Sequence, residues 1–324
     1  MELSTIKESV RDELELLESR LKIRSKTNVS LINQLSAHII QSGGKRMRPL
    51  ILIISSKIGK EANSQIVADA AVVIEFIHAA TLLHDDVVDM SEIRHSKDTA
   101  NTIWGNKGAV LVGDFLYSRA FEIIVEINST EIYKTLAHTT NTIAQGEVMQ
   151  LMNIENTKLT EANYMEIIYR KTAILFEASA KIGGITSECE ENEINYLKKY
   201  GYHFGIAYQL RNDFLDYFGS RSETGKNLTE DLIEGKVTLP IIHSLENCTD
   251  KDKSVIEEAI VGENSSNRSG EIISILKKNN SDAYLMDKIN EQTDLALSSL
   301  DRIPACNYVD LLKNIAEMCR SRDR

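Results

Sequence analysis

The stretch AAVVIEFIHAATLLHDDVVD, residues 70–89, joins a long apolar run to a cluster of three aspartates. Between Ala70 and Leu83 the only charged or ionisable residues are Glu75 and His78. Such a run is typical of a helix that is buried along most of its length, so the chain is predicted to have a large helical core. The run falls short of the ~20 apolar residues that a membrane-spanning helix needs.

The rest of the chain repeats the helical pattern. Its 324 residues include three prolines and 16 glycines, so turn signals are few. No repeat or low-complexity tract divides it, and we predict one large all-α bundle. Apolar residues recur at helical spacing over residues 14–21, 31–40, 67–88, 110–127, 133–152, 162–182, 194–217, 239–245 and 308–318. Breaks are predicted at residues 42–44, 59–64, 91–99, 154–160 and 219–229, and a polar surface hairpin at 247–280.

Charge and cysteine content narrow the function classes. A formal net charge of -11 argues against nucleic-acid binding, which needs basic surfaces. The four cysteines show neither CxxC spacing nor a paired pattern, so no zinc site or disulfide framework is indicated. The charged N-terminus lacks the apolar core of a signal peptide. We therefore expect a cytoplasmic protein without a transmembrane segment.

Three aspartates close the helix of residues 67–88. At about 100° per residue, Asp85 and Asp89 share a face with His78. One interpretation is a solvated acidic helix end, although carboxylates are unfavourable near a helix C-terminus. The apolar residues just before Asp85 instead indicate a buried helix, whose carboxylates need cations. Oxygen ligands at this spacing suit Mg²⁺ that bridges to a phosphate.

A second acidic cluster lies in the predicted helix of residues 194–217. Gln209, Asp213 and Asp216 stand at i, i+4 and i+7 and share one face. Alone, this pattern favours an ordinary amphipathic helix with exposed acids. With the first cluster, it predicts two helices that clamp one polyphosphate through metal ions.

Basic residues gather near the predicted breaks. The motif GGKRMRP, residues 43–49, places a glycine turn before three basic residues at a helix start, which suits a diphosphate. Singly, each basic residue is more often a solvated surface charge, and two glycines are too few for a phosphate-loop motif. The other cationic candidates are Arg94, Lys171 beside Thr172, Lys226 and Lys236.

The motifs together resemble those of one family. They are GGKRMRP, FIHAATLLHDDVVD, GNKGAVLVGDFLYSRAF, QGEVMQLMN, YRKTAILFEASA, YQLRNDFLDY and GKNLTEDLIEGKVTLP. The chain resembles the trans-isoprenyl diphosphate synthases, or polyprenyl synthetase family, and within it the bacterial octaprenyl diphosphate synthases. The resemblance runs from about residue 31 to the C-terminus. It implies a single all-α domain over residues 1–324, of the isoprenoid synthase type, with helices around a deep central cavity and residues 1–30 as a peripheral N-terminal helical segment.

The resemblance also implies the reaction and the residues that serve it. An allylic diphosphate ionises, the double bond of isopentenyl diphosphate attacks the cation, and the departing diphosphate takes the proton. Two or three Mg²⁺ ions bind, with substrate, to Asp85, Asp86, Asp89, Asp213 and Asp216. Isopentenyl diphosphate is assigned to Lys45, Arg48 and His78, and the allylic diphosphate to Arg94, Lys171, Lys226 and Lys236. Thr172 and Gln209 are assigned to the allylic cation.

Two positions depart from the family pattern. His95 stands where a second arginine usually follows the first, and we expect it near isopentenyl diphosphate as a weaker partner, because an imidazole cannot fork onto a phosphate as guanidinium does. Asn212 stands where the second motif usually begins with Asp. A weakly active regulatory subunit is therefore one alternative function. A terpene cyclase is another, although it would lack the isopentenyl diphosphate seat.

Product length is expected to depend on Ala80 and Thr81, one turn before Asp85. In shorter-chain relatives, aromatic residues near these positions close the cavity. The small residues here predict an open channel and a long product from farnesyl diphosphate, such as an octaprenyl chain for quinones. The alternatives are that they serve only close helix packing, or that the product is of geranylgeranyl length. The resemblance further implies a homodimer and leaves room for peripheral membrane contact during product release.

Overall fold

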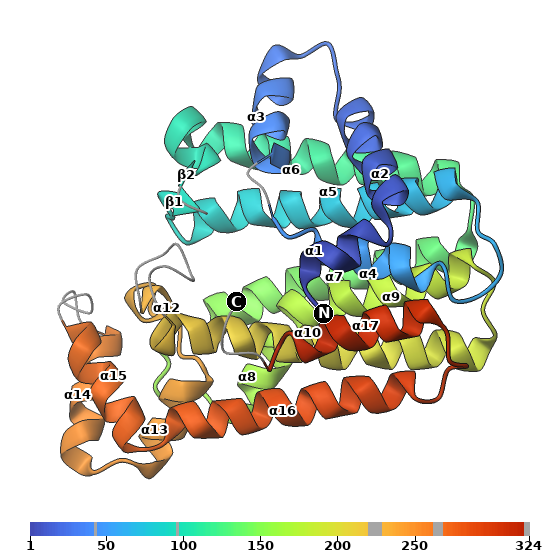
Figure 1. Ribbon diagram of the computed structural model, residues 1–324. Helices are drawn as coiled ribbons and strands as arrows, with labels where there is room; N and C mark the ends of the chain where they lie inside the picture. The colour runs from blue at the N-terminus through green and yellow to red at the C-terminus, as the bar shows by residue number, and fades with distance from the viewer. Residues whose placement is uncertain (42–43, 95–96, 220–228, 262–267, 321–324) are drawn as a thin grey trace. The chain divides into compact units, whose positions relative to one another are not determined.

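A computed structural model describes residues 1–41, 44–94, 97–219, 229–261 and 268–320 (Figure 1). The predicted all-α fold is confirmed. Within the described residues, the one sheet is an antiparallel hairpin of β1 (Ile93–Arg94) and β2 (Lys97–Asp98). In chain order, the helices are α1 (Leu3–Glu8), α2 (Arg11–Arg24), α3 (Ser30–Gln41), α4 (Met47–Ser55), α5 (Ser64–Val88), α6 (Ala100–Ile127), α7 (Thr130–Leu151), α8 (Glu161–Ile168), the π-helix η1 (Tyr169–Ala173), α9 (Ile174–Thr186), α10 (Glu191–Phe218), α12 (Glu230–Ile233), α13 (Leu239–Asn247), α14 (Asp250–Val261), α15 (Ser269–Lys278), α16 (Ser281–Leu300) and α17 (Asn307–Glu317).

The chain divides into two compact units. The first unit comprises Met1–Thr140, Leu175–Gly201 and Ser299–Ile315, and the second comprises Asn141–Ile174, Tyr202–Ser298 and Ala316–Arg324.

In the first unit, α5 is the central helix. It packs against α6 along most of its length and also contacts α2 and α4 (Figure 1). Its side chains from Val67 to Ile77 are all buried, as the apolar run predicted. By length and composition α5 is apolar enough to cross a membrane, but 78% of its most apolar window is buried within the fold. Such burial is typical of the core helix of a soluble protein.

Helix α2 is tied to α5 by two partly buried ion pairs. Arg20 and Arg24 both donate to the carboxylate of Asp69. The distance from Arg20 Nε to Asp69 Oδ1 is 2.8 Å, as is the distance from Arg24 Nη2 to Asp69 Oδ2. Leu17 and Leu21 on the same helix are fully buried. The N-terminal helices are therefore held to the first unit by both apolar packing and charge.

In the second unit, α13 packs against α8, α14 and α15. The polar region predicted as a hairpin contains α14 and α15, which lie against each other (Figure 1). Besides α14 and α15, the described residues contain four helices that the apolar periodicity did not indicate, which are α1, α4, α12 and α16.

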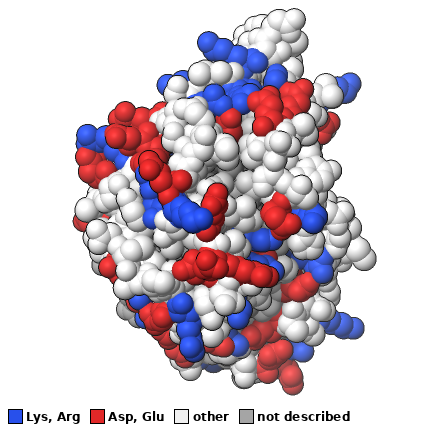
Figure 2. Space-filling view, turned by 90° about the vertical axis from the view of Figure 1, so that its right-hand side faces the viewer, with Lys and Arg blue, Asp and Glu red and all other residues white. Residues whose placement is uncertain are grey.

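Charges of both signs share the surface. Figure 2 shows acidic and basic side chains in mixed groups on one face, without an extended area of a single sign.

Candidate active site

The first aspartates lie at the end of α5. Asp85 and Asp89 are half-buried, whereas Asp86 is 1% exposed. The helix ends at Val88 and is capped by Asp89, whose backbone N–H donates to the carbonyl of Asp85 at 2.7 Å. Asn101 of α6 donates its side-chain amide to the carbonyl oxygens of Asp86 and Ser91, both at 3.1 Å. This amide fixes the turn that follows the aspartates.

His84 packs this turn against α6. Its Nε2 lies 3.3 Å from the carbonyl oxygen of Val110 and 3.4 Å from the carboxylate of Asp114. A Cβ at Gly113 would lie 2.3 Å from the same nitrogen, so only glycine allows the approach. His84 and Gly113 were not among the predicted site residues, although both lie within the family motifs.

Arg48 and His78, predicted to bind one diphosphate, come together in the first unit. The guanidinium Nη1 of Arg48 lies 3.2 Å from Nε2 of His78. Its Cζ also stacks 4.3 Å from the ring centre of Phe176 in α9. Lys45 is exposed two residues before α4.

Arg46, the remaining basic residue of the motif, is engaged within the protein. It adopts a left-handed conformation with φ of 54° and donates to Glu18, to Glu75 and to the carbonyl of Ile40 at 2.6 Å. These contacts hold the start of α4 to α2 and α5. Arg46 is therefore a structural residue, which the motif alone did not distinguish from its neighbours.

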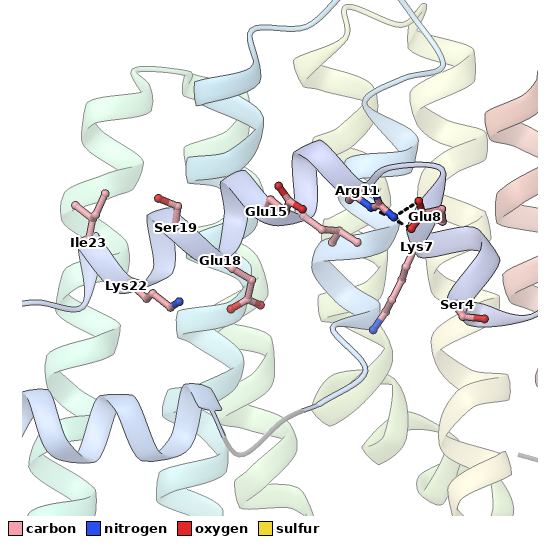
Figure 3. A pocket seen from close by; sticks show the side chains of 10 residues that line it. Ser4, Lys7, Glu8, Arg11, Glu15, Glu18, Ser19, Lys22 and Ile23 are labelled. Atoms are coloured by element: carbon pink, nitrogen blue, oxygen red, sulfur yellow. Dashed lines mark hydrogen bonds and ion pairs between the residues drawn. The ribbon is translucent and has the colours of Figure 1, made fainter.

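A hollow of about 700 Å³ follows α1 and α2 (Figure 3). Lys7 leaves α1 and points toward the segment that precedes α4 (Figure 3). Burial lowers the pKa of Lys7, and the nearby charges of Arg46 and Lys45 lower it further. The lining mixes both signs of charge and contains none of the predicted site residues.

In the second unit, the π-helix η1 carries Lys171 and Thr172. A single π-turn within a longer helix shifts the side chains that follow and is frequent at functional sites. Gly146 of α7 lies against this turn, because a Cβ there would be 2.7 to 2.9 Å from Arg170 and from the backbone nitrogen of Lys171. The predicted helix of residues 162–182 thus contains a π-turn at its candidate site residues.

Lys171 is held by two residues of α7. Its ammonium donates to Glu147 Oε2 and to Gln150 Oε1, both at 2.6 Å. Sequence reasoning gave neither residue a role, although both belong to the motif QGEVMQLMN. The spacing of three residues between them was the available signal, because it places both on one face of α7.

Thr172, Gln209, Asp213 and Tyr164 form a chain of hydrogen bonds. Thr172 Oγ1 lies 3.0 Å from Gln209 Oε1, and Gln209 Nε2 donates to Asp213 Oδ1 at 2.8 Å. The hydroxyl of Tyr164 in α8 donates to Asp213 Oδ2. Asp213 is 1% exposed, so these donors replace the water that its carboxyl loses.

Asp216 belongs to α10, and its carboxylate lies against the first residues of α12. Its two oxygens accept from the backbone N–H groups of Glu230 at 3.1 Å and Asp231 at 3.4 Å. Burial, together with the nearby charge of Asp231, raises the pKa of Asp216 to about 9 and that of Asp213 to about 8. Asp231 was not predicted as a site residue.

A cavity of about 120 Å³ brings most of these groups together within the second unit. Lys236 lines it and donates to Glu234 at 2.5 Å. The charged and polar lining residues are Gln150, Asn153, Tyr164, Lys171, Thr172, Gln209, Asp213, Asp231, Lys236 and Thr238.

Some predicted residues lie outside the described structure. These are Gly43, His95, Lys226 and the side chain of Arg94.

The carboxylates suit a divalent cation that also binds a substrate. Among the described residues, no three His, Cys, Asp or Glu side chains are grouped so that they could hold a metal by themselves. All candidate ligands are oxygens, which Mg²⁺ prefers, and Mg²⁺ commonly takes only one or two carboxylates and completes its shell with phosphate and water. The buried Asp213 beside Asp231 would also gain from a nearby positive charge.

Comparison with known proteins identifies the family. Residues 29–277 match the sequence model of polyprenyl synthetases. Octaprenyl diphosphate synthase of Escherichia coli (strain K12) is 38% identical over 325 residues, with 100% of each chain covered. A decaprenyl diphosphate synthase structure from Rhodobacter capsulatus is 30% identical, with 100% of each chain covered and a TM-score of 0.93. A polyprenyl synthase from Caulobacter crescentus CB15, solved with calcium and isoprenyl diphosphate, is 34% identical, with 99% and 98% covered and a TM-score of 0.93.

The chain belongs to the polyprenyl synthetase family. It is therefore an enzyme that transfers prenyl groups, and the family resemblance found in the sequence is confirmed.

Proposed function

We propose that this chain condenses an allylic diphosphate, preferably farnesyl diphosphate, with successive molecules of isopentenyl diphosphate to make a polyprenyl diphosphate of about octaprenyl length. The observation that carries the proposal is the cavity of the second unit, where Lys171 and Lys236 lie with the carboxyl of Asp213. Lysines can neutralise a diphosphate, while the carboxyl can hold its metal ion.

Each cluster has a role in this proposal. Asp85, Asp86 and Asp89 in the first unit, and Asp213 and Asp216 in the second, are proposed Mg²⁺ ligands. When bound, Mg²⁺ would neutralise the charge that develops on the leaving diphosphate. The calcium in the Caulobacter structure supports a divalent cation in this family.

The protein's own groups position the substrates. Lys171 and Lys236 are proposed to bind the allylic diphosphate, and their present partners Glu147 and Glu234 keep both ammonium groups oriented. Arg94 and Lys226 are proposed to assist them. Thr172 and Gln209 would face the reacting carbon, since both line the same cavity.

Arg48, His78 and Lys45 are proposed to bind isopentenyl diphosphate, with His95 nearby. Phe176 supports one face of the Arg48 guanidinium and fixes its plane. A fixed guanidinium can form paired hydrogen bonds to a phosphate with little further loss of side-chain freedom.

Product length is proposed to depend on Thr81 more than on Ala80. Ala80 is 0% exposed, whereas Thr81 is partly exposed on the same side of α5 as Asp85. The Thr81 hydroxyl donates to the carbonyl of His78 at 2.8 Å, which leaves its methyl group as the apolar contact. A prenyl chain bound at Asp85 would therefore meet a small apolar surface here.

A homodimer is also part of the proposal. Leu111 and Val125 of α6 are 67% and 71% exposed, and Val110 and Phe121 are exposed on the same side of the helix. Exposed apolar residues on one side of a helix are suited to contact with a second copy of the same helix. Light scattering would test this, with Leu111→Asp plus Val125→Asp expected to give monomers.

We further propose a cytoplasmic enzyme whose product serves quinone synthesis, with peripheral membrane contact at product release.

Purified protein with Mg²⁺, farnesyl diphosphate and labelled isopentenyl diphosphate tests the proposed reaction. Chromatography of the dephosphorylated products should show chains longer than 20 carbons, the length of a geranylgeranyl group. Products that end at 20 carbons would show that the chain is a short-chain synthase. If no allylic primer is elongated, the proposal is refuted.

A further inference from the structure

Tyr164 contacts a proposed metal ligand from behind. The side chain comes from α8, is 3% exposed, and donates its hydroxyl hydrogen to Asp213 Oδ2. The other oxygen, Asp213 Oδ1, accepts from Gln209 at 2.8 Å. Both oxygens of the carboxyl are therefore held by side chains of the second unit.

Two fixed donors restrict how the carboxyl can turn. A carboxylate has about four acceptor positions, so two remain for a cation after Tyr164 and Gln209 are counted. A donor on each oxygen fixes rotation about the last side-chain bond, which is otherwise broad. The carboxyl is thus oriented before a metal ion arrives.

The burial of Asp213 makes this donor necessary. A buried carboxyl that loses one hydrogen-bond partner is penalised, because no water replaces it. Tyr164 can supply the hydrogen bond without adding charge, so the attraction between the carboxylate and a cation is kept. A lysine in its place would compete with the metal.

We propose that Tyr164 is a positioning residue that orients Asp213 for a divalent cation bound with diphosphate. The inference rests on the proposed function, because that function makes Asp213 a metal ligand. Groups that orient a metal ligand in this way typically change metal affinity or activity by about 10–100-fold when they are removed.

The test is Tyr164→Phe, which removes one oxygen and keeps the ring. The Mg²⁺ concentration for half-maximal turnover should rise about 10-fold or more, while kcat at saturating Mg²⁺ stays near that of the unaltered protein. A direct readout is Mn²⁺ binding, followed by electron paramagnetic resonance with inorganic diphosphate present. Its Kd should rise by a similar factor.

The matched control is Tyr200→Phe. Tyr200 is also fully buried, and its hydroxyl donates to the carbonyl of Leu312 at 3.0 Å, within the first unit. Loss of this hydroxyl should leave the Mg²⁺ dependence and the Mn²⁺ Kd unchanged. If the Mn²⁺ Kd rose by the same factor in both variants, the cause would be a general disturbance of core packing. That result would overturn the proposal.

Further outcomes separate the proposal from the proposed function. A folded Tyr164→Phe protein with unchanged Mn²⁺ Kd and Mg²⁺ dependence overturns the role of Tyr164. If the unaltered protein binds Mn²⁺ with diphosphate but makes no product, the proposed reaction fails while the binding comparison still decides the role of Tyr164. Should Tyr164→Phe not fold, Tyr164→Met, which also lacks the hydroxyl and adapts its shape, is measured instead.

Discussion

The two aspartate clusters are built differently. In the first unit, Asp85 and Asp89 are half-buried at the end of a helix. In the second unit, Asp213 is buried and both of its oxygens accept hydrogen bonds from side chains. In the first cluster, Asp85 and Asp89 thus retain contact with solvent beside the buried Asp86. In the second cluster, the Asp213 carboxyl is fixed in the interior beside the half-buried Asp216. Because burial raises the pKa of Asp213 to about 8 and that of Asp216 to about 9, loss of a bound metal ion should favour the protonated carboxyls of the second cluster.

The largest expected effect is at the more exposed cluster. Asp85→Ala or Asp89→Ala should lower turnover by about 10²–10³-fold, because a charge-stabilising group is lost where charge develops. Circular dichroism should show the same helical content, and EDTA should abolish product formation. The exposed Asp12→Ala is the control and should retain full turnover. Normal turnover in the Asp85 and Asp89 variants would remove this cluster from the mechanism.

The next effect tests whether the second cluster depends on fixed geometry. Gly146→Ala places a Cβ within 3 Å of Arg170 and the Lys171 backbone, so η1 must shift. A displacement of about 1 Å can cost on the order of 100-fold in turnover, and we expect a loss of that size. Gly108→Ala is the control, since its Cβ would meet only ordinary van der Waals contacts at 3.4 and 3.5 Å. Equal kcat/KM in both variants would show that the π-turn tolerates movement.

Substitutions one turn before the first cluster are expected to change the chain length of the product more than the rate of the reaction. Thr81→Phe should yield shorter chains at similar initial turnover, because a bulky ring would obstruct the prenyl chain. Ala80→Phe should instead lower the melting temperature, since the site is fully buried and overpacking costs about 1–3 kcal/mol. Chromatographic product sizing and thermal melting separate the two. If Thr81→Phe still made products of wild-type length, the prenyl chain would not pass Thr81. The small side chain there would then no longer support a long product.

The smallest effect concerns the pH dependence of stability without metal. Burial raises the pKa of Asp213 to about 8 in the fold, above its usual value of 3.8. Between those values the folded state binds more protons than the unfolded state, so stability falls as pH rises from about 4 to 8. Asp213→Asn should flatten this dependence and raise the melting temperature at pH 8 by a few degrees. An unchanged slope of melting temperature against pH would contradict the raised pKa.

The sequence predicted α5 and its aspartates well because the apolar run and the acidic end are local features. The apolar periodicity did not indicate α4, because its short, continuous apolar run has no helical period, although the motif GGKRMRP predicted a helix start there. It also did not indicate α16, where Thr293 and Ala296 occupy buried positions between Leu285 and Leu300 and weaken the apolar pattern.

The candidate site shows the same limit. The family motifs pointed to Lys171 and Asp213, but their partners Glu147 and Tyr164 come from other helices. The π-turn lies against Gly146 of α7, where a side chain would clash with it. The sequence of residues 169–173 alone cannot indicate this contact. Packing between distant segments therefore decides how the predicted residues are oriented.

The hydrogen-bond chain has a definite direction. The Gln209 amide nitrogen points to Asp213, so its carbonyl oxygen must face Thr172. That oxygen can only accept, and the single proton of the Thr172 hydroxyl is therefore committed to it. Toward the rest of the cavity, Thr172 can then offer only lone pairs. In the proposed reaction, a hydroxyl whose proton is committed to Gln209 presents the negative end of its dipole to the positively charged allylic carbon.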